Sequence, residues 1–242
     1  MKKAIIFCMS ALLCLLVSGG VLAKDFKKIK IRPNDPVIRA LMERHSTKSF
    51  IDKKLNARDL SNILWAAAGI NRPEFDDDGN VIGGKLTIPT AMNVQHVIVY
   101  AVLEEGVYQY DPINNELVPV PGMEGDYRTD AAYQPPYHIA PLNLIFVADL
   151  TKWPGPPWPG YPNRDELIYT AAISVGCAAQ NVYLYLADTK RLGGTYRTAM
   201  NKELWHEYLG LPDLYDDQGD YTEPEKLVMG GMTIGYPAPP AD

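Results

Sequence analysis

The stretch Arg44-His45-Ser46-Thr47-Lys48-Ser49-Phe50 says most about the fold of this chain and about its site. If the stretch is extended, side chains two residues apart point to the same side, so Arg44, Ser46 and Lys48 converge. A guanidinium, a hydroxyl and an ammonium group together suit a phosphate monoester. A solvated basic turn explains the same residues at least as well, so the stretch alone leaves both interpretations open.

A second candidate segment is Pro89-Thr90-Ala91-Met92-Asn93-Val94-Gln95-His96, which leads into a predicted strand. Its small residues would let the backbone approach a flat ligand, and the Asn93 amide offers both a donor and an acceptor to a heterocycle edge. The alternative is an ordinary junction between a loop and a strand.

Together the two segments resemble the nitroreductase family. The first, followed by Lys53-Lys54-Leu55, is similar to the family's N-terminal FMN-binding segment, and Pro89–Asn93 is similar to its Pro-Ser-small-x-Asn motif. Within the family the chain looks most like the SagB-type branch. Further motifs that carry this resemblance are Gly69–Pro73, Gly106–Asp111, Ala140-Pro141, Ala178–Asn181 and Gly235–Pro237.

The resemblance implies that FMN lies at the interface of an obligate homodimer. Arg44, Ser46 and Lys48 then match contacts to the phosphate, ribityl chain and ring, and His45 contributes mainly through its backbone. A second copy of the chain lays its Pro89–Asn93 segment against the flavin. The cofactor-binding residues predicted in that segment and near the ring are Pro89, Thr90, Ala91, Asn93 and, beside the isoalloxazine, Gln134 and the Thr195–Ala199 loop.

The resemblance also implies a mechanism. Hydride enters and leaves at flavin N5 in alternating half-reactions, a ping-pong cycle, because the cofactor carries the chemistry. Lys48 is the predicted catalytic residue, since a fixed cation stabilises negative charge on reduced flavin. The chain lacks the family's C-terminal basic pair, so phosphate binding depends on Arg44 with help from Arg197. Leu86 and Thr90 also depart from the branch's usual Arg and Ser, which predicts weaker FMN binding.

The pattern of elements predicts an α+β fold, because helices and strands mix without a regular βαβ alternation. The resemblance adds a central, mostly antiparallel sheet flanked by helices. We expect loops at residues 71–87, with a turn at Asp76–Asn80, an irregular stretch at 122–140 and a turn at 190–195. The last strand, 228–235, need not pair within its own chain. The other predicted elements are helices at 37–44, 57–68, 164–186 and 201–209, with the third one buried all round, and strands at 94–103, 106–111, 116–120 and a central one at 142–148.

The first 23 residues have the pattern of a secretory signal peptide: Lys2-Lys3, an apolar run, then small residues ending at Ala23. An uncleaved anchor is the alternative, because 20 uncharged residues are just long enough to span a bilayer. We therefore expect an exported protein, periplasmic or secreted, with one domain at residues 24–242. Nicotinamide is scarce there, so either a donor other than NAD(P)H reduces the flavin or the enzyme oxidises its substrate and passes electrons onward.

Composition and missing motifs exclude several classes. The chain of 242 residues is 47% hydrophobic and 21% charged, which excludes a disordered chain. Its net charge of −6, or 21 − 29 = −8 without the first 23 residues, gives no footprint for nucleic acid. We predict no metal site. The four histidines are not spaced as metal ligands, and the Asp76–Asn80 turn does not match the calcium-loop pattern. Cys177 is expected to be a buried hydrophobe rather than a nucleophile.

These observations predict an FMN-dependent oxidoreductase with a small-molecule substrate and a separate electron donor, either NAD(P)H or another reductant. The alternative is an exported flavin-binding protein or a degenerate, non-catalytic relative. The proline-rich loop at residues 153–162 is a candidate substrate lid in which Trp153 and Trp158 could stack on a flat substrate, with ordinary surface packing as the alternative.

Overall fold

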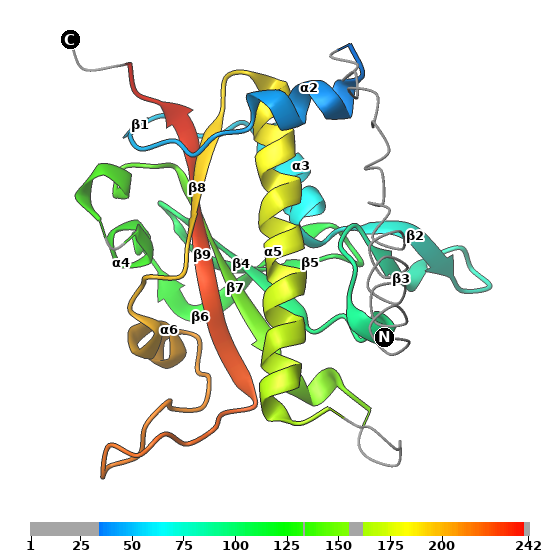
Figure 1. The fold of residues 1–242 in the computed structure, drawn as a ribbon, viewed down its shortest axis with the longest axis vertical. Helices are drawn as coiled ribbons and strands as arrows, with labels where there is room; N and C mark the ends of the chain where they lie inside the picture. The colour runs from blue at the N-terminus through cyan, green and yellow to red at the C-terminus, as the bar shows by residue number, and fades with distance from the viewer. Residues whose placement is uncertain (1–33, 133, 155–161, 240–242) are drawn as a thin grey trace, which may run out of the picture.

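The computed structural model describes residues 34–132, 134–154 and 162–239. The predicted signal peptide and Trp158 lie outside these residues. Most described strands belong to one sheet, in which every pairing is antiparallel, so the predicted sheet type is confirmed. The strand order is β1-β9-β7-β4-β5-β6, with β8 also on β9 (Figure 1). The strands are β1 Phe50–Ile51, β4 Val97–Leu103, β5 Gly106–Asp111, β6 Glu116–Glu124, β7 Leu142–Asp149, β8 Gly193–Arg197 and β9 Lys226–Pro237.

Strand β7 lies in the middle of the sheet, as predicted, between β9 and β4. All eight of its residues are buried, which explains why Leu142–Asp149 is a nearly continuous apolar run rather than an alternating one. The last strand was not required to pair within its own chain, but it does: β9 pairs with β7 along one edge and with β8 and then β1 along the other.

One face of the sheet is covered by helices α3 (Ala57–Ala68) and α5 (Arg164–Thr189), and α2 (Pro36–Glu43) packs against α5. The Asn56 side chain accepts from the backbone N–H of Asp59 and caps α3, as its sequence predicts. Helix α5 begins with a capping box between Asn163 and Glu166. The side chains of α3 and α5 form the main core with alternate residues of β4, β7 and β9.

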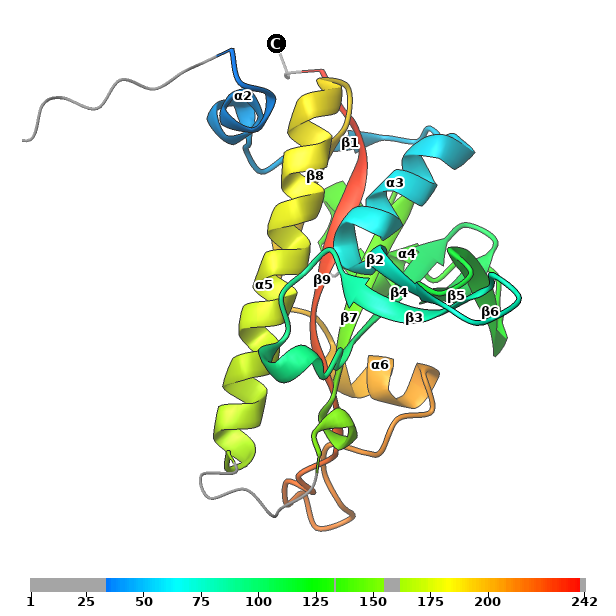
Figure 2. The same cartoon turned by 90° about the vertical axis from the view of Figure 1, so that its right-hand side faces the viewer.

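The opposite face carries α4 (Arg128–Ala132) and α6 (Lys202–Tyr208), with the fully buried Trp205 against β7 (Figure 2). Short 3-10 turns at Ala91–Asn93 (η1), Pro135–Tyr137 (η2) and Leu150–Lys152 (η3) complete the described elements. A two-stranded hairpin, β2 (Ile70–Phe75) with β3 (Val81–Leu86), stands apart from the main sheet.

Four sequence predictions are wrong in detail. Residues 71–87 were expected to be a loop but form most of the β2–β3 hairpin. The sequence does not reveal the two strands, because Pro73 and two glycines interrupt their alternation of apolar and polar residues. The stretch 122–140 contains α4, and Gly193-Gly194 begins strand β8 instead of closing a turn. Helix α5 is long and apolar enough to span a membrane by length and composition, yet it covers the sheet. It is not buried all round, because Tyr169 and Ile173 are 69% and 50% exposed.

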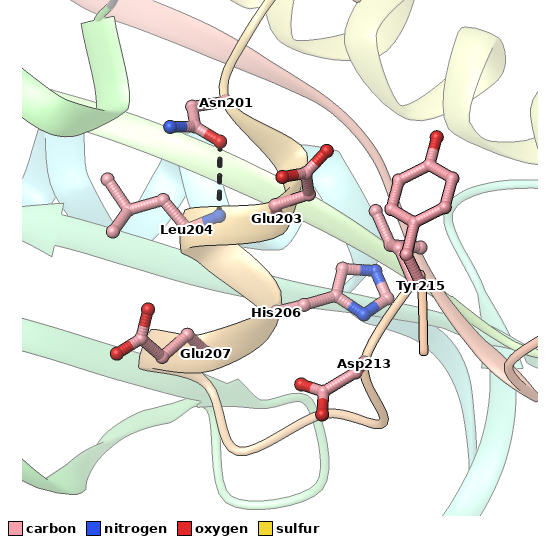
Figure 3. Close-up of a pocket in the computed structure, with 8 residues that line it drawn as sticks. Asn201, Glu203, Leu204, His206, Glu207, Asp213 and Tyr215 are labelled. Atoms are coloured by element: carbon pink, nitrogen blue, oxygen red, sulfur yellow. Dashed lines mark hydrogen bonds between the residues drawn. The ribbon is translucent and has the colours of Figure 1, made fainter. Parts of the chain in front are cut away.

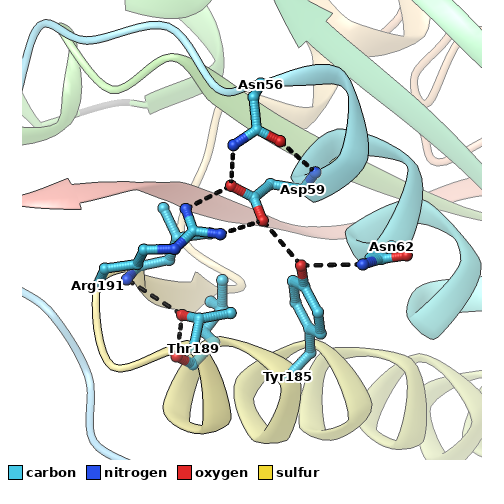
Figure 4. Close-up of polar contacts among 8 residues, drawn as sticks. Asn56, Asp59, Asn62, Tyr185, Thr189 and Arg191 are labelled. Carbon is cyan, nitrogen blue, oxygen red and sulfur yellow. Dashed lines mark hydrogen bonds and ion pairs between the residues drawn. The ribbon is translucent and has the colours of Figure 1, made fainter.

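An ion pair between the buried Asp59 and the half-exposed Arg191 lies just before β8 (Figure 4). Asp59 on α3 is 1% exposed and meets the Arg191 guanidinium with two contacts of 2.5 and 2.6 Å. The Tyr185 hydroxyl and the Asn56 amide also donate to this carboxylate, at 2.9 and 2.7 Å. Arg191 stands two residues before β8, so the network ties α3 and the end of α5 to the strand beside the site.

Candidate functional site

The Arg44–Phe50 stretch runs along the outer edge of β8. The backbone N–H of Thr47 donates to the Gly194 carbonyl at 3.0 Å, and the Thr195 hydroxyl donates to the Thr47 carbonyl. The backbone N–H of Ala238, just after β9, donates to the Ser49 carbonyl at 3.0 Å. The stretch is therefore held as an extra extended segment on the sheet, rather than as a free turn.

Thr47 and Phe50 are the buried residues of this stretch, and burial does not alternate strictly, because Ser49 is exposed like Ser46 and Lys48. Thr47 is only 6% exposed and lies against Gly193, where a Cβ would come within 2.8 Å of the Thr47 Cβ. Ser46 and Lys48, on either side of it, are exposed. The structure therefore places the two predicted ligand side chains on the face that Thr47 does not occupy.

Tyr183 of α5 links the basic segment to β8, and no motif in the sequence marks this residue. The Arg44 guanidinium lies 5.2 Å from the centre of the Tyr183 ring. The Tyr183 hydroxyl lies 3.1 Å from the Ser46 Oγ and accepts from the Tyr196 backbone N–H at 2.8 Å. Ser46 and Tyr183 are 137 positions apart in the sequence, so only the fold could reveal their contact.

Two cations of this segment lack carboxylate partners. Within the described residues, neither Arg44 nor Lys48 takes part in an ion pair. His45 is exposed, and its Nδ1 lies 2.8 Å from the Glu43 carbonyl oxygen, consistent with a backbone rather than a ring contribution. Two cations without carboxylate partners and a hydroxyl are the groups that an anion with several oxygen atoms requires.

A second polar group lies at the end of β8. Arg197 donates from one terminal nitrogen to the Thr233 hydroxyl at 2.5 Å, and Thr233 donates to the Asn143 side-chain oxygen at 2.5 Å. The Arg197 guanidinium stacks 4.6 Å from the centre of the Tyr137 ring. Burial lowers the pKa of Arg197. The exposed Gln134 begins the turn that carries Tyr137. The contact between Arg197 and Tyr137 therefore joins the Gln134 turn to the Thr195–Ala199 loop, two regions predicted to lie near the site.

The Pro89–Asn93 segment has an unusual backbone. Met92, Asn93 and Gln95 have positive φ values of 52°, 60° and 52°, a conformation that non-glycine residues rarely adopt. The Gln95 N–H donates to the Thr90 hydroxyl at 3.2 Å, and its amide donates to the Gly84 carbonyl at 2.7 Å. Such strain concentrates at functional sites, which favours a binding role over an ordinary junction.

The two candidate segments do not meet within one chain. Ala91 packs in a cluster with Ala171 near the start of α5, whereas Arg44 lies over Tyr183, twelve residues further along that helix. A helix rises 1.5 Å per residue, so the two contact points are about 18 Å apart along its axis. The two segments therefore contact α5 at different levels along its axis.

Other cavities do not offer a better site. A hollow of about 400 Å³ beside α6 is lined by acidic residues and His206 (Figure 3). Both ring nitrogens of His206 already have hydrogen-bond partners, since its Nδ1 lies 2.6 Å from the Pro212 carbonyl and its Nε2 accepts from the Val228 backbone N–H at 3.2 Å. No cluster of three metal-ligating side chains exists among the residues that the structure covers.

Trp153 does not serve as an open lid residue. It is 8% exposed and stacks on the buried His96, with ring centres 6.2 Å apart. Of the two alternatives for Trp153, packing is therefore the one that the structure supports, because the indole lies in the core. Trp158 lies outside the described residues. Cys177 is partly buried against the main core, as its apolar surroundings suggest.

Comparisons with known proteins agree on one family. The nitroreductase family model matches residues 41–236. A Methanocaldococcus jannaschii protein named as a nitroreductase is 29% identical over 171 residues, which is 70% of this chain and 78% of that protein. A crystal structure of a protein named as a nitroreductase from Ralstonia eutropha JMP134 is 27% identical, with a TM-score of 0.67 over 89% of this chain and 87% of that one.

A more distant structure shares the fold alone. A chain in the Escherichia coli microcin synthetase McbBCD complex with truncated pro-MccB17 is 16% identical to this chain. The two superpose with a TM-score of 0.62 over 95% of this chain and 82% of that one.

Proposed function

The chain belongs to the nitroreductase family and is an oxidoreductase of that family; from this premise we propose that it works with FMN. The observation that carries the proposal is the Arg44–Lys48 segment, which is fixed on β8 by Thr47 and presents cations without carboxylate partners among the described residues. A phosphate monoester fits these side chains, because the Arg44 guanidinium can bind it through two N–H groups and the Ser46 hydroxyl adds a further hydrogen bond.

When bound, FMN would supply a centre that accepts and donates hydride at its N5 atom. In the proposed site Arg44 and Ser46 hold the phosphate and ribityl chain, with Tyr183 positioning both side chains. Lys48 follows in the same extended segment and stabilises negative charge at the ring. A cation placed there in advance favours the reduced cofactor, since no reorganisation is needed when the charge appears.

We further propose that the site is completed by a second copy of the chain. The strained Pro89–Asn93 segment lies about 18 Å along α5 from the Arg44 contact, so a homodimer is the simplest way to bring both to one cofactor. Helix α5 also exposes Tyr169 and Ile173 four residues apart, an apolar stripe suited to a partner surface. Gly176, one turn further, is exposed as well and allows close approach.

The location and the electron supply are part of the proposal. Residues 1–23 support export, so a small-molecule reductant other than NAD(P)H, or a substrate that is itself oxidised, would feed the flavin. Two motifs support membership of the SagB-type branch. Gly69–Pro73 covers the end of α3 and the start of β2, and Gly106–Asp111 is strand β5.

The alternative proposal is a relative that binds flavin but does not turn it over. Anaerobic photoreduction of the FMN-loaded protein, followed by rapid mixing with ferricyanide or a quinone, separates the two. Reoxidation on mixing over repeated cycles supports the oxidoreductase with a ping-pong exchange. Flavin that binds but cannot be reduced and reoxidised in the protein would support the non-catalytic relative instead.

A further inference from the structure

Helix α2 is attached to the protein through its charged side. The Arg39 guanidinium donates to the Asp188 carboxylate at 3.2 Å, and the Glu43 carboxylate lies 3.6 Å from the Lys190 ammonium group. Asp188 and Lys190 lie at the end of α5, so the two ion pairs fasten α2 to that end. The buried residue of α2 is the small Ala40.

The apolar side of α2 faces away from the protein. Val37, Leu41 and Met42 are 64%, 48% and 62% exposed. Val37 and Leu41 are neighbours on the helix surface, and each stands two residues before Arg39 or Glu43, which places it on roughly the opposite side of the helix. In both views α2 lies outside α5, and no other labelled element covers its outer side (Figures 1 and 2). A group of exposed apolar side chains of this kind marks a site of contact with another surface.

The residues just before α2 have a charge opposite to that of the rest of the chain. Residues 24–32 contain five cations and one carboxylate, a net charge of 5 − 1 = +4, whereas residues 33–242 carry 16 − 28 = −12. The basic stretch ends three residues short of α2, so it is next to the apolar side of that helix in the chain. It reads Lys24-Asp25-Phe26-Lys27-Lys28-Ile29-Lys30-Ile31-Arg32, with three apolar residues among the cations.

A basic stretch beside an apolar helix side matches one kind of surface. Anionic phospholipids attract Lys and Arg side chains that lie within a Debye length of the membrane, about 10 Å at 0.1 M salt. An amphipathic helix places its apolar side chains at the boundary between headgroups and acyl chains. Residues 24–32 also directly follow an apolar run that is long enough to span a bilayer, so they start at a membrane surface whether that run is cleaved or kept.

We propose that residues 24–32 and the outer side of α2 dock the protein on the anionic surface of a phospholipid membrane. The cations contact lipid phosphates, and Val37, Leu41 and Met42 enter the headgroup boundary. The acidic remainder of the chain is repelled by the same lipids, which turns the α2 end of the molecule toward the membrane. The inference does not depend on the proposed function, because it uses none of the residues assigned to FMN.

The test measures cosedimentation of the protein beginning at Lys24 with lipid vesicles. Every described element lies after residue 33, so this form contains the whole described fold. Phosphatidylcholine vesicles with about 30% phosphatidylglycerol should bind it at least about tenfold more tightly than phosphatidylcholine alone, and this preference should shrink as salt rises. Equal binding to both kinds of vesicle, or binding to neither, would overturn the proposal.

One pair of variants tests the contribution of charge. Lys27→Gln combined with Lys28→Gln should weaken binding to the anionic vesicles by at least about tenfold, since each cation close to such a surface strengthens binding several-fold. Arg58→Gln combined with Lys85→Gln is the matched control, because it removes two exposed cations from other parts of the surface and should leave binding unchanged. Equal weakening by both pairs would mean that only the net charge matters, and the docking surface would be wrong.

A second pair tests the apolar side of α2. Val37→Gln combined with Leu41→Gln should weaken vesicle binding by at least about tenfold while keeping the unfolding transition, because both side chains are exposed in the free protein. Ile82→Gln is the control, since Ile82 is 59% exposed on β3 and should not affect binding. Other occupants of this side of α2 give different results. Dissociation of a dimer by the double variant would show that a second copy covers it, and a lower unfolding transition would show that another part of the chain does. Either result would overturn the proposal.

Discussion

The backbone N–H of Thr47 donates to the carbonyl oxygen of Gly194 at 3.0 Å, and this bond fastens the basic segment to the sheet. Thr47 occupies the buried side of the segment, so its neighbours Ser46 and Lys48 face outward. Gly193 makes this possible, since a side chain there would collide with Thr47. The position of the proposed cofactor ligands therefore depends on a residue without a side chain.

Gly193→Ala should displace Thr47 and weaken FMN binding by at least about tenfold, a loss of ~1.4 kcal/mol. The new Cβ would lie 2.8 Å from the Thr47 Cβ, inside van der Waals contact. Fluorescence titration of FMN measures the change. Gly83→Ala is the matched control, because nothing lies within 4 Å of a Cβ at that position on β3. Equal loss in both variants would argue against a specific role for Gly193.

Lys48→Ala should lower the reduction potential of the bound flavin and weaken its binding. Removal of one stabilising cation worth ~1.4 kcal/mol in the reduced state shifts a two-electron potential by about 30 mV. Redox titration with a reference dye measures the shift. Lys202→Ala, at the start of α6, removes a cation from another part of the surface and should leave the potential unchanged. An unchanged potential and affinity in Lys48→Ala would contradict its assignment.

Asp59→Asn should lower the free energy of unfolding by about 2–3 kcal/mol, because the buried carboxylate accepts charge-assisted hydrogen bonds from Arg191. Arg191 and Tyr185 lower the pKa of this carboxyl in the folded protein. The unfolded chain therefore binds the proton more readily, so the stabilisation is complete above the unfolded pKa of about 4 and is lost as the pH falls through the lower folded value.

Urea unfolding between neutral and acidic pH measures both effects for Asp59. The difference between wild type and Asp59→Asn should shrink toward acidic pH. Asp188→Asn breaks an ion pair with Arg39 whose side chains are 56% and 41% exposed, so it should change stability little at any pH. A pH-independent difference for Asp59→Asn would show that its charge is not the cause.

Met92→Gly should raise the free energy of unfolding by ~0.5–1 kcal/mol. The left-handed backbone of Met92 costs a non-glycine residue roughly 1–2 kcal/mol, and the greater freedom of glycine in the unfolded chain offsets part of that gain. Met42→Gly is the control with the opposite sign. Met42 lies in α2 and is 62% exposed, and glycine in a helix costs up to about 1 kcal/mol. If Met92→Gly is destabilised like Met42→Gly, the strain at the Pro89–Asn93 segment is not real.

Ile173→Glu should convert the proposed homodimer to a monomer and should also reduce FMN binding. Ile173 is 50% exposed on α5, and a charge in the middle of an apolar interface lacks a partner. Ile113→Glu is the control, since Ile113 is 42% exposed in the turn between β5 and β6. Sedimentation velocity gives the oligomeric state. Dimers that persist in Ile173→Glu would place the interface elsewhere.

Local signals predicted much of the fold. The Asn56 cap, Gly69 and the apolar stripe between them define α3 to the residue, and the continuous apolar run predicts the central β7. The β2–β3 hairpin was missed because Pro73 and the paired glycines hide its alternation. Strand β8 was missed for a similar reason, because Gly193 and Gly194 are typical of turns. The fold explains them by close packing: Thr47 lies against Gly193, and Leu186 and Met232 lie against Gly194.

The site was predictable only in part. The spacing of Arg44, Ser46 and Lys48 is local, so the sequence contains it. Tyr183 and Tyr137 position Arg44 and Arg197 through contacts between distant segments, and no local pattern marks them. The distance between the two candidate segments along α5 is likewise a property of the fold.

FMN binding by the Arg44–Lys48 segment is tested by an absorption spectrum of the protein after FMN incubation and gel filtration. We expect the wild-type protein to elute as a dimer with the two absorption bands of an oxidised flavin. Arg44→Ala, with its phosphate contact removed, should elute without them while keeping the same unfolding transition. A colourless wild-type protein, or an Arg44→Ala variant that retains full flavin, would contradict FMN binding by this segment.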